Sequence, residues 1–337
     1  KGEFLSHKDV NKILKIEKSD IKSNTNVNDQ GKIEDFKGSY DLHINEILNL
    51  KHVNSDIIRK KRFKIVVDGI NSSGGIIIPK LLEALNVEVI KINCIPDGNF
   101  AHDPEPLDKN LDQLKEEVLK SNSDLGIAVD PDVDRLVFVS ENGETISEEN
   151  TLISCADYIL SKEKGSAVSN LSSSMGLRDV CKMYGVEYFS SMVGEINVVE
   201  KMKSVNAIIG GEGNGGIIYP ESHYGRDALV GIGLLLTSLA LKNKTISELF
   251  EKLPKYHMLK EKIKIDNDLD FINIKNKLKS TFHNFSFNEI DGLKIENNTS
   301  WVHVRKSNTE PIIRIYIESK NKQDSKALFT AVRKALR

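Results

Sequence analysis

The amino-acid sequence predicts tandem, related α/β domains followed by a C-terminal α+β domain with helices on an antiparallel sheet. From Phe63 onward, a short apolar strand, a Gly/Ser turn, a helix and another strand follow one another, and this order is typical of a βαβ unit. From Ser166 a second strand again leads into serines and a helix, which indicates a duplicated fold. After Lys252 the order changes to helix, several strands and helix, as in an α+β domain.

The order of elements divides the chain into four parts. Residues 1–53 are polar, with helical patterns but no strand-rich core, so we expect the remnant of a first domain and a connecting helix. The second α/β domain is predicted over residues 54–147, the third over residues 148–252 and the C-terminal domain over residues 253–337. The individual elements are expected over residues 63–68, 76–85, 87–92, 107–121 and 124–129, then 166–169, 175–184, 206–209 and 228–241, and last 269–279, 285–295, 301–305, 312–317 and 322–337.

The composition is that of a globular protein with apolar cores, since 39% of the residues are hydrophobic and 28% are charged. The 47 basic and 49 acidic residues give a net charge of −2, and this balance predicts no nucleic-acid partner. No apolar run approaches the ~20 residues that span a bilayer, so no membrane partner is predicted. Three cysteines without metal-type spacing fit reduced thiols in the cytoplasm, whereas the oligomeric state has no sequence signal.

An acidic turn, Asp130-Pro-Asp-Val-Asp-Arg135, lies between two predicted apolar strands. The alternate carboxylates of Asp130, Asp132 and Asp134 can direct their oxygens at one point, which suits a hard divalent cation such as Mg²⁺. A solvated acidic hairpin tip is the plainer alternative. An EF-hand would need glycine where Arg135 stands and helices on both sides. An aspartyl-phosphate hydrolase would need a different residue after its Asp-x-Asp, so neither of these two classes fits.

A glycine-rich segment, Gly210-Gly-Glu-Gly-Asn-Gly-Gly216, follows another predicted strand. Its glycines let the backbone approach a ligand closely, and Glu212 and Asn214 can hydrogen-bond neighbouring sugar hydroxyls. A phosphate-binding loop is the alternative, but the Walker lysine is absent and the glycines lack the dinucleotide spacing. A merely flexible loop would not require a carboxylate among its glycines.

A third segment, Arg305-Lys-Ser-Asn-Thr-Glu-Pro311, precedes a strand that carries Arg314. Guanidinium groups, hydroxyls, an amide and the N–H groups of a turn can together bind a phosphate. The residues that supply such side chains are Arg305, Ser307, Asn308, Thr309 and Arg314. A bare Ser-Asn-Thr turn is the alternative, and the adjoining arginines favour the phosphate site.

In this order and spacing, the three segments resemble those of the α-D-phosphohexomutase family. The family has four domains, of which three are related three-layer α/β units with mixed sheets, and its enzymes are Mg²⁺-dependent. The resemblance implies Mg²⁺ ligation by Asp130, Asp132 and Asp134, and a catalytic place for Arg135 beside the transferred phosphate. It also implies sugar contacts for Gly194, Glu195, Glu212 and Asn214, and contacts with the other phosphate for Arg305, Ser307, Asn308, Thr309 and Arg314.

The family's catalytic serine motif, Thr-Ala-Ser-His-Asn-Pro, is absent from the sequence. In the family, that phosphoserine gives its phosphoryl group to a sugar monophosphate, the sugar bisphosphate reorients, and its other phosphate returns to the serine. We therefore expect most of the first domain to be missing and this chain alone to be inactive. A lysine that some relatives carry in the third domain is replaced by Ser172, so no acid/base role transfers to that position.

The substrate that the resemblance implies is a hexose phosphate, interconverted between its 1- and 6-phosphates through the bisphosphate. The Gly-Glu-Gly-Asn-Gly form of the glycine-rich segment and Val193-Gly-Glu195 resemble a branch with phosphoglucosamine mutases and bifunctional glucose/mannose enzymes, and we favour glucosamine phosphate. A non-catalytic sugar-phosphate binder and a phosphatase are the alternatives. Three aspartates argue against simple binding, and no replacement nucleophile for a phosphatase is evident.

Overall fold

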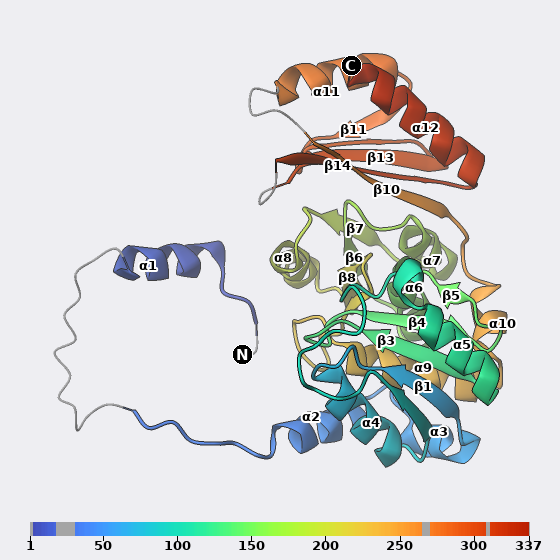
Figure 1. Cartoon of the computed structure of the whole chain (residues 1–337). Coiled ribbons are helices and arrows are strands. Elements are labelled where there is room, and N and C mark those ends of the chain that lie inside the picture. Colours follow the sequence, from blue (N-terminus) through green and yellow to red (C-terminus); the bar gives the residue numbers. More distant parts are fainter. Residues whose placement is uncertain (1–2, 18–30, 265–269, 308–310, 337) are drawn as a thin grey trace.

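The computed structural model describes residues 3–17, 31–264, 270–307 and 311–336 (Figure 1). Among the described residues, three helices precede the first strand, α1 (His7–Glu17), α2 (Ser39–Leu48) and α3 (Ser55–Lys61). Helix α1 projects from the body of the molecule (Figure 1), and several of its apolar side chains are exposed to solvent. Its start contacts the body, because Val10 lines the cavity described below and Glu3 pairs with Lys203 of the second α/β unit at 2.5 Å. Helix α2, in contrast, buries Ile44 and Ile47 in the main hydrophobic core.

The first sheet is a mixed sheet with the strand order β2-β1-β3-β4-β5. Strands β2, β1 and β3 are parallel, β4 pairs antiparallel with β3, and β5 pairs antiparallel with β4. Its strands are β1 (Lys64–Asp68), β2 (Glu88–Ile92), β3 (Leu125–Val129), β4 (Leu136–Ser140) and β5 (Thr145–Ile146), and its helices are α3 (Ser55–Lys61), α4 (Gly74–Ala84), the 3₁₀ turn η2 (Asp108–Asn110) and α5 (Asp112–Ser121). Alternate side chains of β1 enter two different cores, because Ile65 packs in the main core and Val66 packs with Leu114 of α5. The sheet therefore has helices on both faces.

The second sheet repeats this arrangement with the order β7-β6-β8-β9, where β7, β6 and β8 are parallel and β9 is antiparallel. Its strands are β6 (Ala167–Asn170), β7 (Tyr188–Ser191), β8 (Ile209–Glu212) and β9 (Gly216–Ile218), and its helices are α6 (Glu148–Lys162), α7 (Gly176–Tyr184), α8 (Glu195–Val205), α9 (Ala228–Lys242) and α10 (Ile246–Phe250). Helix α9 is buried from Ala228 to Ala240. The main core joins this helix to side chains of the first sheet, so the two α/β units share one apolar interior.

The C-terminal sheet is antiparallel throughout, with the order β10-β14-β13-β12-β11. Its strands are β10 (His257–Lys264), β11 (Ser286–Asn288), β12 (Leu293–Glu296), β13 (Ser300–Lys306) and β14 (Ile312–Ser319), and its helices are α11 (Phe271–Thr281) and α12 (Lys322–Ala335). Figure 1 shows both helices on one face of the sheet, while the other face lies toward the second sheet. The helices and the sheet enclose a separate hydrophobic core.

The predicted fold class is confirmed: two mixed α/β sheets are followed by an antiparallel sheet with helices on it. Helix α6 was not predicted, because it is buried on nearly all sides and so lacks an amphipathic stripe. Strand β10 was also not predicted, because it is an edge strand rich in Lys and Glu, which favour helices. Among the described residues, none of the helices combines the length and the apolar composition that crossing a membrane requires.

Candidate active site

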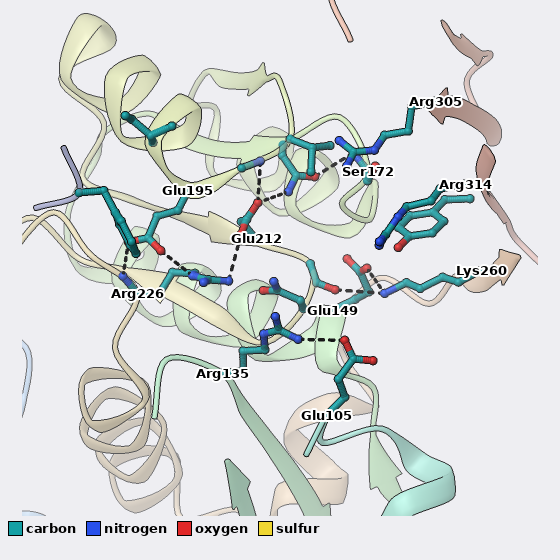
Figure 2. Close-up of a pocket in the computed structure, with 18 of the residues that line it drawn as sticks. Glu105, Arg135, Glu149, Ser172, Glu195, Glu212, Arg226, Lys260, Arg305 and Arg314 are labelled. Atoms are coloured by element: carbon teal, nitrogen blue, oxygen red, sulfur yellow. Dashed lines mark hydrogen bonds and ion pairs between the residues drawn. The ribbon is translucent and has the colours of Figure 1, made fainter. Parts of the chain in front are cut away.

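A cavity of about 560 Å³ opens where the two α/β units meet the C-terminal sheet (Figure 2). Several side chains predicted for the site line it: Arg135, Gly194, Glu195, Glu212, Asn214, Arg305 and Arg314. The three aspartates are not among its lining residues but lie beside Arg135, whose Nε is 3.3 Å from Asp130 Oδ2. Ser307 follows β13 directly, and Asn308 and Thr309 lie outside the described residues.

The metal loop (residues 130–135) connects β3 to β4, two buried strands that pair antiparallel. Asp130 holds the loop in shape, because its Oδ1 accepts hydrogen bonds from the backbone N–H groups of Asp134 and Arg135 at 3.1 and 3.0 Å. Val133 adopts a φ of 61°, which is a strained conformation for a β-branched residue. Strain of this kind persists only where the surrounding contacts enforce it, and it is common at functional sites.

A second segment fixes the metal loop from outside. The hydroxyl groups of Ser72 and Ser73, at the start of α4, both donate hydrogen bonds to the carbonyl oxygen of Pro131, at 2.8 and 2.6 Å. The Gly/Ser turn that the sequence placed after β1 thus supports the aspartates directly. Its glycines are required, since a Cβ on Gly74 would lie 2.5 Å from the side chain of Val129.

The metal loop concentrates negative charge in a largely buried place. One carboxylate oxygen from each of Asp130, Asp132 and Asp134 lies within 4.8 Å of the others. Burial and the charge of Asp134 raise the pKa of Asp130 to about 7, and burial also raises the pKa of Asp134. Asp134 Oδ1 is buried with no hydrogen-bond partner among the described residues. An oxygen-only ligand set with one unsatisfied carboxylate oxygen fits a hard divalent cation, which would offset this repulsion.

Arg135 carries positive charge from the metal loop into the cavity. Its Nη1 lies 3.3 Å from Glu105 Oε1 (Figure 2). Its Nε lies beside Asp130 Oδ2. The Arg135 side chain is 29% exposed and lines the cavity, so it can meet a ligand there. An arginine held in this way suits an anionic group that binds next to the three aspartates.

The sugar loop (residues 210–216) begins in β8 and turns into β9. Glu212 is buried at the end of β8, where its Oε1 accepts hydrogen bonds from Asn170 Nδ2 at 2.7 Å and from Gly194 N–H at 3.1 Å. Gly215 has a φ of 92°, and a Cβ there would lie 2.6 Å from the carbonyl oxygen of Leu136 in β4. The loop therefore needs glycine to pack against the strand that leaves the metal loop.

Two arginines of the predicted phosphate site lie on neighbouring strands. Arg305 of β13 and Arg314 of β14 are directly paired in the sheet register, and both line the cavity. Arg305 Nη1 lies 3.2 Å from Asp291 Oδ2, and Ser307 N–H donates to Ile312 O at 3.0 Å to close the turn. Figure 2 shows both arginines on the side of the cavity that belongs to the C-terminal sheet. Two guanidinium groups at one place are typical of a phosphate site.

Three parts of the chain that line the cavity each match a model of one protein family. Family models for phosphoglucomutase/phosphomannomutase α/β/α domains II and III match residues 41–143 and 147–256, and the model for the C-terminal domain matches residues 259–335. The chain belongs to the phosphoglucomutase/phosphomannomutase family. The resemblance inferred from the three sequence segments is thereby confirmed.

Two relatives of this chain come from archaea. The chain is 36% identical to the phosphoglucomutase/phosphomannomutase of Thermococcus kodakarensis, over 81% of this chain and 60% of that protein. It is 34% identical to a phosphoglucosamine/phosphogalactosamine mutase of Sulfurisphaera tokodaii, over 87% of this chain and 65% of that protein. The chain thus spans about three fifths to two thirds of the length of these relatives.

Solved structures show the same fold. A phosphoglucomutase/phosphomannomutase family protein from Burkholderia thailandensis aligns with a TM-score of 0.76 and 24% identity, over 88% of this chain and 64% of that protein. The N-acetylphosphoglucosamine mutase of Aspergillus fumigatus, solved with GlcNAc-6P and magnesium, aligns with a TM-score of 0.61 and 15% identity, over 88% of this chain and 68% of that protein. At these identities the likeness concerns the fold of the family alone.

Arg226 is a site residue of this phosphoglucomutase/phosphomannomutase family member that the sequence analysis missed. Its side chain is 12% exposed and binds Glu195 at 2.7 Å and Glu212 at 3.1 Å (Figure 2). It also binds a third carboxylate, that of Asp134. Burial raises the pKa of Glu195, and the charge of Arg226 opposes that rise. One guanidinium therefore joins the metal loop, the sugar loop and the first residue of α8. The only available sequence signal was a charged Arg226-Asp227 pair directly before a long apolar helix.

Lys260 is the second missed residue, and it joins the C-terminal sheet to the sugar loop. It projects from β10 into the cavity, where its Nζ lies 3.0 Å from Glu149 Oε1 and 2.9 Å from Glu148 Oε1. It also donates to the carbonyl oxygen of Gly213 at 3.3 Å. Because β10 itself was not predicted, no pattern in the sequence pointed to this lysine.

Ser172 and His303 form a pair across the boundary between the second sheet and the C-terminal sheet. His303 Nε2 lies 2.6 Å from the carbonyl oxygen of Asp291, which can only accept, so this nitrogen carries the proton. Burial lowers the pKa of His303 to about 4, so the ring is neutral and its Nδ1 accepts the hydroxyl proton of Ser172 at 2.8 Å. Ser172 therefore presents its oxygen lone pairs, and not its proton, to the cavity that it lines.

We expect Ser172→Ala to lower the free energy of unfolding by about 1–3 kcal/mol, because His303 Nδ1 would be left buried without a donor. Urea denaturation followed by circular dichroism measures the effect. Ser204→Ala is the matched control, since its hydroxyl donates to Lys201 O on the exposed side of α8. A Ser172→Ala chain as stable as the Ser204→Ala chain would contradict the assigned donor direction.

Proposed function

We propose that this chain carries the metal-, sugar- and phosphate-binding parts of a phosphohexomutase that interconverts hexose 1-phosphates and 6-phosphates through a sugar bisphosphate. One observation carries the proposal: a single cavity joins Arg135 of the metal loop, Glu212 of the sugar loop and the arginine pair Arg305 and Arg314. Anion-binding groups at two ends with hydrogen-bonding groups between them fit a sugar that bears a phosphate at either end.

Each group of residues would bind a different part of the ligand. Arg305 and Arg314 would hold the phosphate that is not transferred, in either orientation of the sugar. Arg135 would contact the phosphate that is transferred, beside the place where Asp130, Asp132 and Asp134 would hold Mg²⁺. When bound there, Mg²⁺ would offset negative charge at the transferred phosphoryl group. Glu212 Oε1 already accepts from Asn170 and Gly194, so a sugar hydroxyl would donate to Oε2, which accepts from Arg226 and has a second lone pair.

The phosphoryl donor of this mutase would be a serine outside the 337 residues, because the motif Thr-Ala-Ser-His-Asn-Pro does not occur among them. This chain alone would bind hexose phosphates weakly and turn none over. The free thiols of Cys94, Cys155 and Cys181 support a reducing, cytoplasmic setting.

The preferred substrate that we propose is glucosamine phosphate. The name of the relative from Sulfurisphaera tokodaii, and that of a relative from Methanopyrus kandleri called "Probable phosphoglucosamine mutase" (30% identical over 90% of this chain and 67% of that protein), support a 2-amino sugar. The name of the relative from Thermococcus kodakarensis supports the alternative, glucose and mannose phosphates. A non-catalytic sugar-phosphate-binding protein is the second candidate function, because the donor serine is absent from the sequence.

The test is the interconversion of 1- and 6-phosphates with Mg²⁺, assayed on the chain joined to a phosphoserine domain, for glucosamine, glucose and mannose. We expect turnover with at least one sugar, and fastest turnover with glucosamine phosphate. Binding of sugar phosphates without turnover, although the serine is phosphorylated, would favour the non-catalytic binder. Faster turnover of glucose or mannose phosphate would overturn the preferred substrate only.

We expect Arg305→Ala to weaken the binding of glucosamine 6-phosphate by about tenfold or more, because a charge-assisted contact with phosphate is lost. Isothermal titration calorimetry on this chain measures the change. Lys306→Ala is the matched control, since it removes the same charge at the next position of β13, from a side chain that lies over the Phe271 ring. An equal loss of affinity in both variants would contradict a specific phosphate contact by Arg305.

A further inference from the structure

A second group of possible metal ligands lies outside the catalytic cavity. This group consists of His43 on α2, His223 in the loop after β9, and Asp227, which directly precedes α9. His43 Nε2 lies 2.8 Å and His223 Nε2 lies 3.0 Å from the same atom, Asp227 Oδ2. None of the three side chains lines the cavity of the candidate active site. Three segments far apart in the sequence thus direct their polar atoms at one point.

The orientation of Asp227 is fixed independently of the two histidines. Its Oδ1 accepts hydrogen bonds from the N–H groups of Leu229 and Val230, at 2.8 and 3.3 Å, and so caps α9. This leaves Oδ2 directed at the histidines. No hydrogen-bond partner among the described residues holds His223 Nδ1, so the proton of that ring can move to Nδ1 and free Nε2 to bind an ion.

The spacing and exposure of the three atoms suit an ion. Ligand atoms that each bind a transition ion at about 2.0–2.2 Å lie about 3 Å apart at a right angle and about 3.4 Å apart in the tetrahedral arrangement usual for zinc, so a small outward shift of the histidines from the distances found here would admit an ion. The side chains of His43 and His223 are 28% and 30% exposed, whereas that of Asp227 is 6% exposed. An ion could therefore enter from solvent on the histidine side and meet a preformed carboxylate.

Nearby charge favours a cation at this place. Glu46 lies one turn after His43 on α2, and its negative charge acts on both histidines. Glu46 Oε1 also accepts a hydrogen bond from Ser222 Oγ at 2.9 Å, which ties α2 to the loop that carries His223. The positive end of the α9 dipole would disfavour a cation, but the carboxylate of Asp227 lies between that helix end and the two histidines.

We propose that His43, His223 and Asp227 bind a divalent transition ion of the Zn²⁺ class, and that this ion ties helix α2 to the start of α9. Imidazole nitrogens select Zn²⁺, Co²⁺ or Ni²⁺ over Mg²⁺, whereas the oxygen-only metal loop has the opposite preference. The chain would then hold two different metals at two separate sites. Because Asp227 directly follows Arg226, the ion would also steady the segment that carries Arg226.

The test is equilibrium dialysis of the metal-stripped chain against Zn²⁺ in excess Mg²⁺, with bound zinc measured by mass spectrometry. We expect a single Zn²⁺ per chain, with an affinity that falls about tenfold or more in His43→Ala and in His223→Ala. His52→Ala is the matched control and should bind Zn²⁺ as the unchanged chain does, since His52 pairs with Glu163 at 3.3 Å and belongs to none of the possible metal-ligand groups among the described residues. Asp132→Ala should also leave Zn²⁺ binding unchanged.

Thermal unfolding separates loss of the site from loss of the fold. Zn²⁺ should raise the Tm of the unchanged chain and of His52→Ala but not that of His43→Ala, while the metal-free chains unfold at similar temperatures. Absence of Zn²⁺ binding by the folded chain would overturn the proposal. Equal binding by all variants would overturn it as well, because the ion would then sit elsewhere.

Discussion

Replacing Asp132 by alanine is expected to weaken the binding of Mg²⁺ by about tenfold or more and to reduce turnover of the complete enzyme by at least about a hundredfold. Asp132 is the cleanest of the three aspartates to replace, because it is exposed. Asp130 holds two backbone N–H groups of the metal loop, and Asp134 binds Arg226, so their removal would also disturb the fold. Paramagnetic resonance of Mn²⁺ used as a probe measures the affinity without any need for activity.

Asp56→Ala provides the comparison for this experiment. Asp56 is also an exposed aspartate, but it lies on α3, away from the metal loop, and pairs with Arg59 at 3.2 Å. Its removal should change neither the affinity for Mn²⁺ nor turnover. Undiminished Mn²⁺ binding in Asp132→Ala would show that the metal loop is not the binding site, whatever the activity of the enzyme.

Replacing Arg226 by methionine is expected to lower the free energy of unfolding by about 3–5 kcal/mol. Methionine keeps much of the side-chain length but leaves Asp134, Glu195 and Glu212 as largely buried carboxylates without their shared cation. The affinity for sugar phosphates should fall as well, because the sugar loop and the metal loop lose the group that joins them. Urea denaturation measures the first effect, and calorimetric titration with glucosamine 6-phosphate measures the second.

The pH dependence of this loss identifies its cause. Burial already raises the pKa of Asp134 and Glu195, and without Arg226 these values would rise further. The folded variant would then bind more protons than the unfolded chain, so its stability should increase as the pH falls from about 8 to about 5. Arg226→Lys, which keeps the charge, should lose less stability and show a weaker pH dependence. A pH-independent deficit in Arg226→Met would point to lost packing instead of unpaired carboxylates.

The sequence allowed a prediction of those loops of the candidate site whose residues are neighbours in the chain. The metal loop was predictable because three aspartates at alternate positions stand between two apolar strands, and β3 and β4 form as expected. The fold class was predictable for a similar reason, since the change from alternating βα units to an antiparallel sheet is visible in the order of elements.

Contacts between distant segments could not be predicted in this way. Arg226 meets Asp134 from 92 positions away in the chain, and Ser172 meets His303 from 131 positions away. No local periodicity encodes such a meeting, because it depends on how the sheets pack against one another. The same limit applies to the contacts of Glu212 with Asn170, Gly194 and Arg226, which the sequence could not predict, whereas its contact with a sugar stays a prediction.

The division of the hydrophobic interior into two separate cores has a mechanical consequence. The main core runs without interruption from α2 through the first sheet to α9 and the second sheet, so these elements should unfold and move as one cooperative block. The C-terminal sheet has its own core and meets that block through polar contacts such as Lys260–Glu149 and Ser172–His303. Polar contacts re-form at low cost when water enters, so this boundary is the natural hinge of the molecule. Arg305 and Arg314 would then swing toward and away from a rigid half-site, and opening the cavity would not disturb the metal loop or the sugar loop.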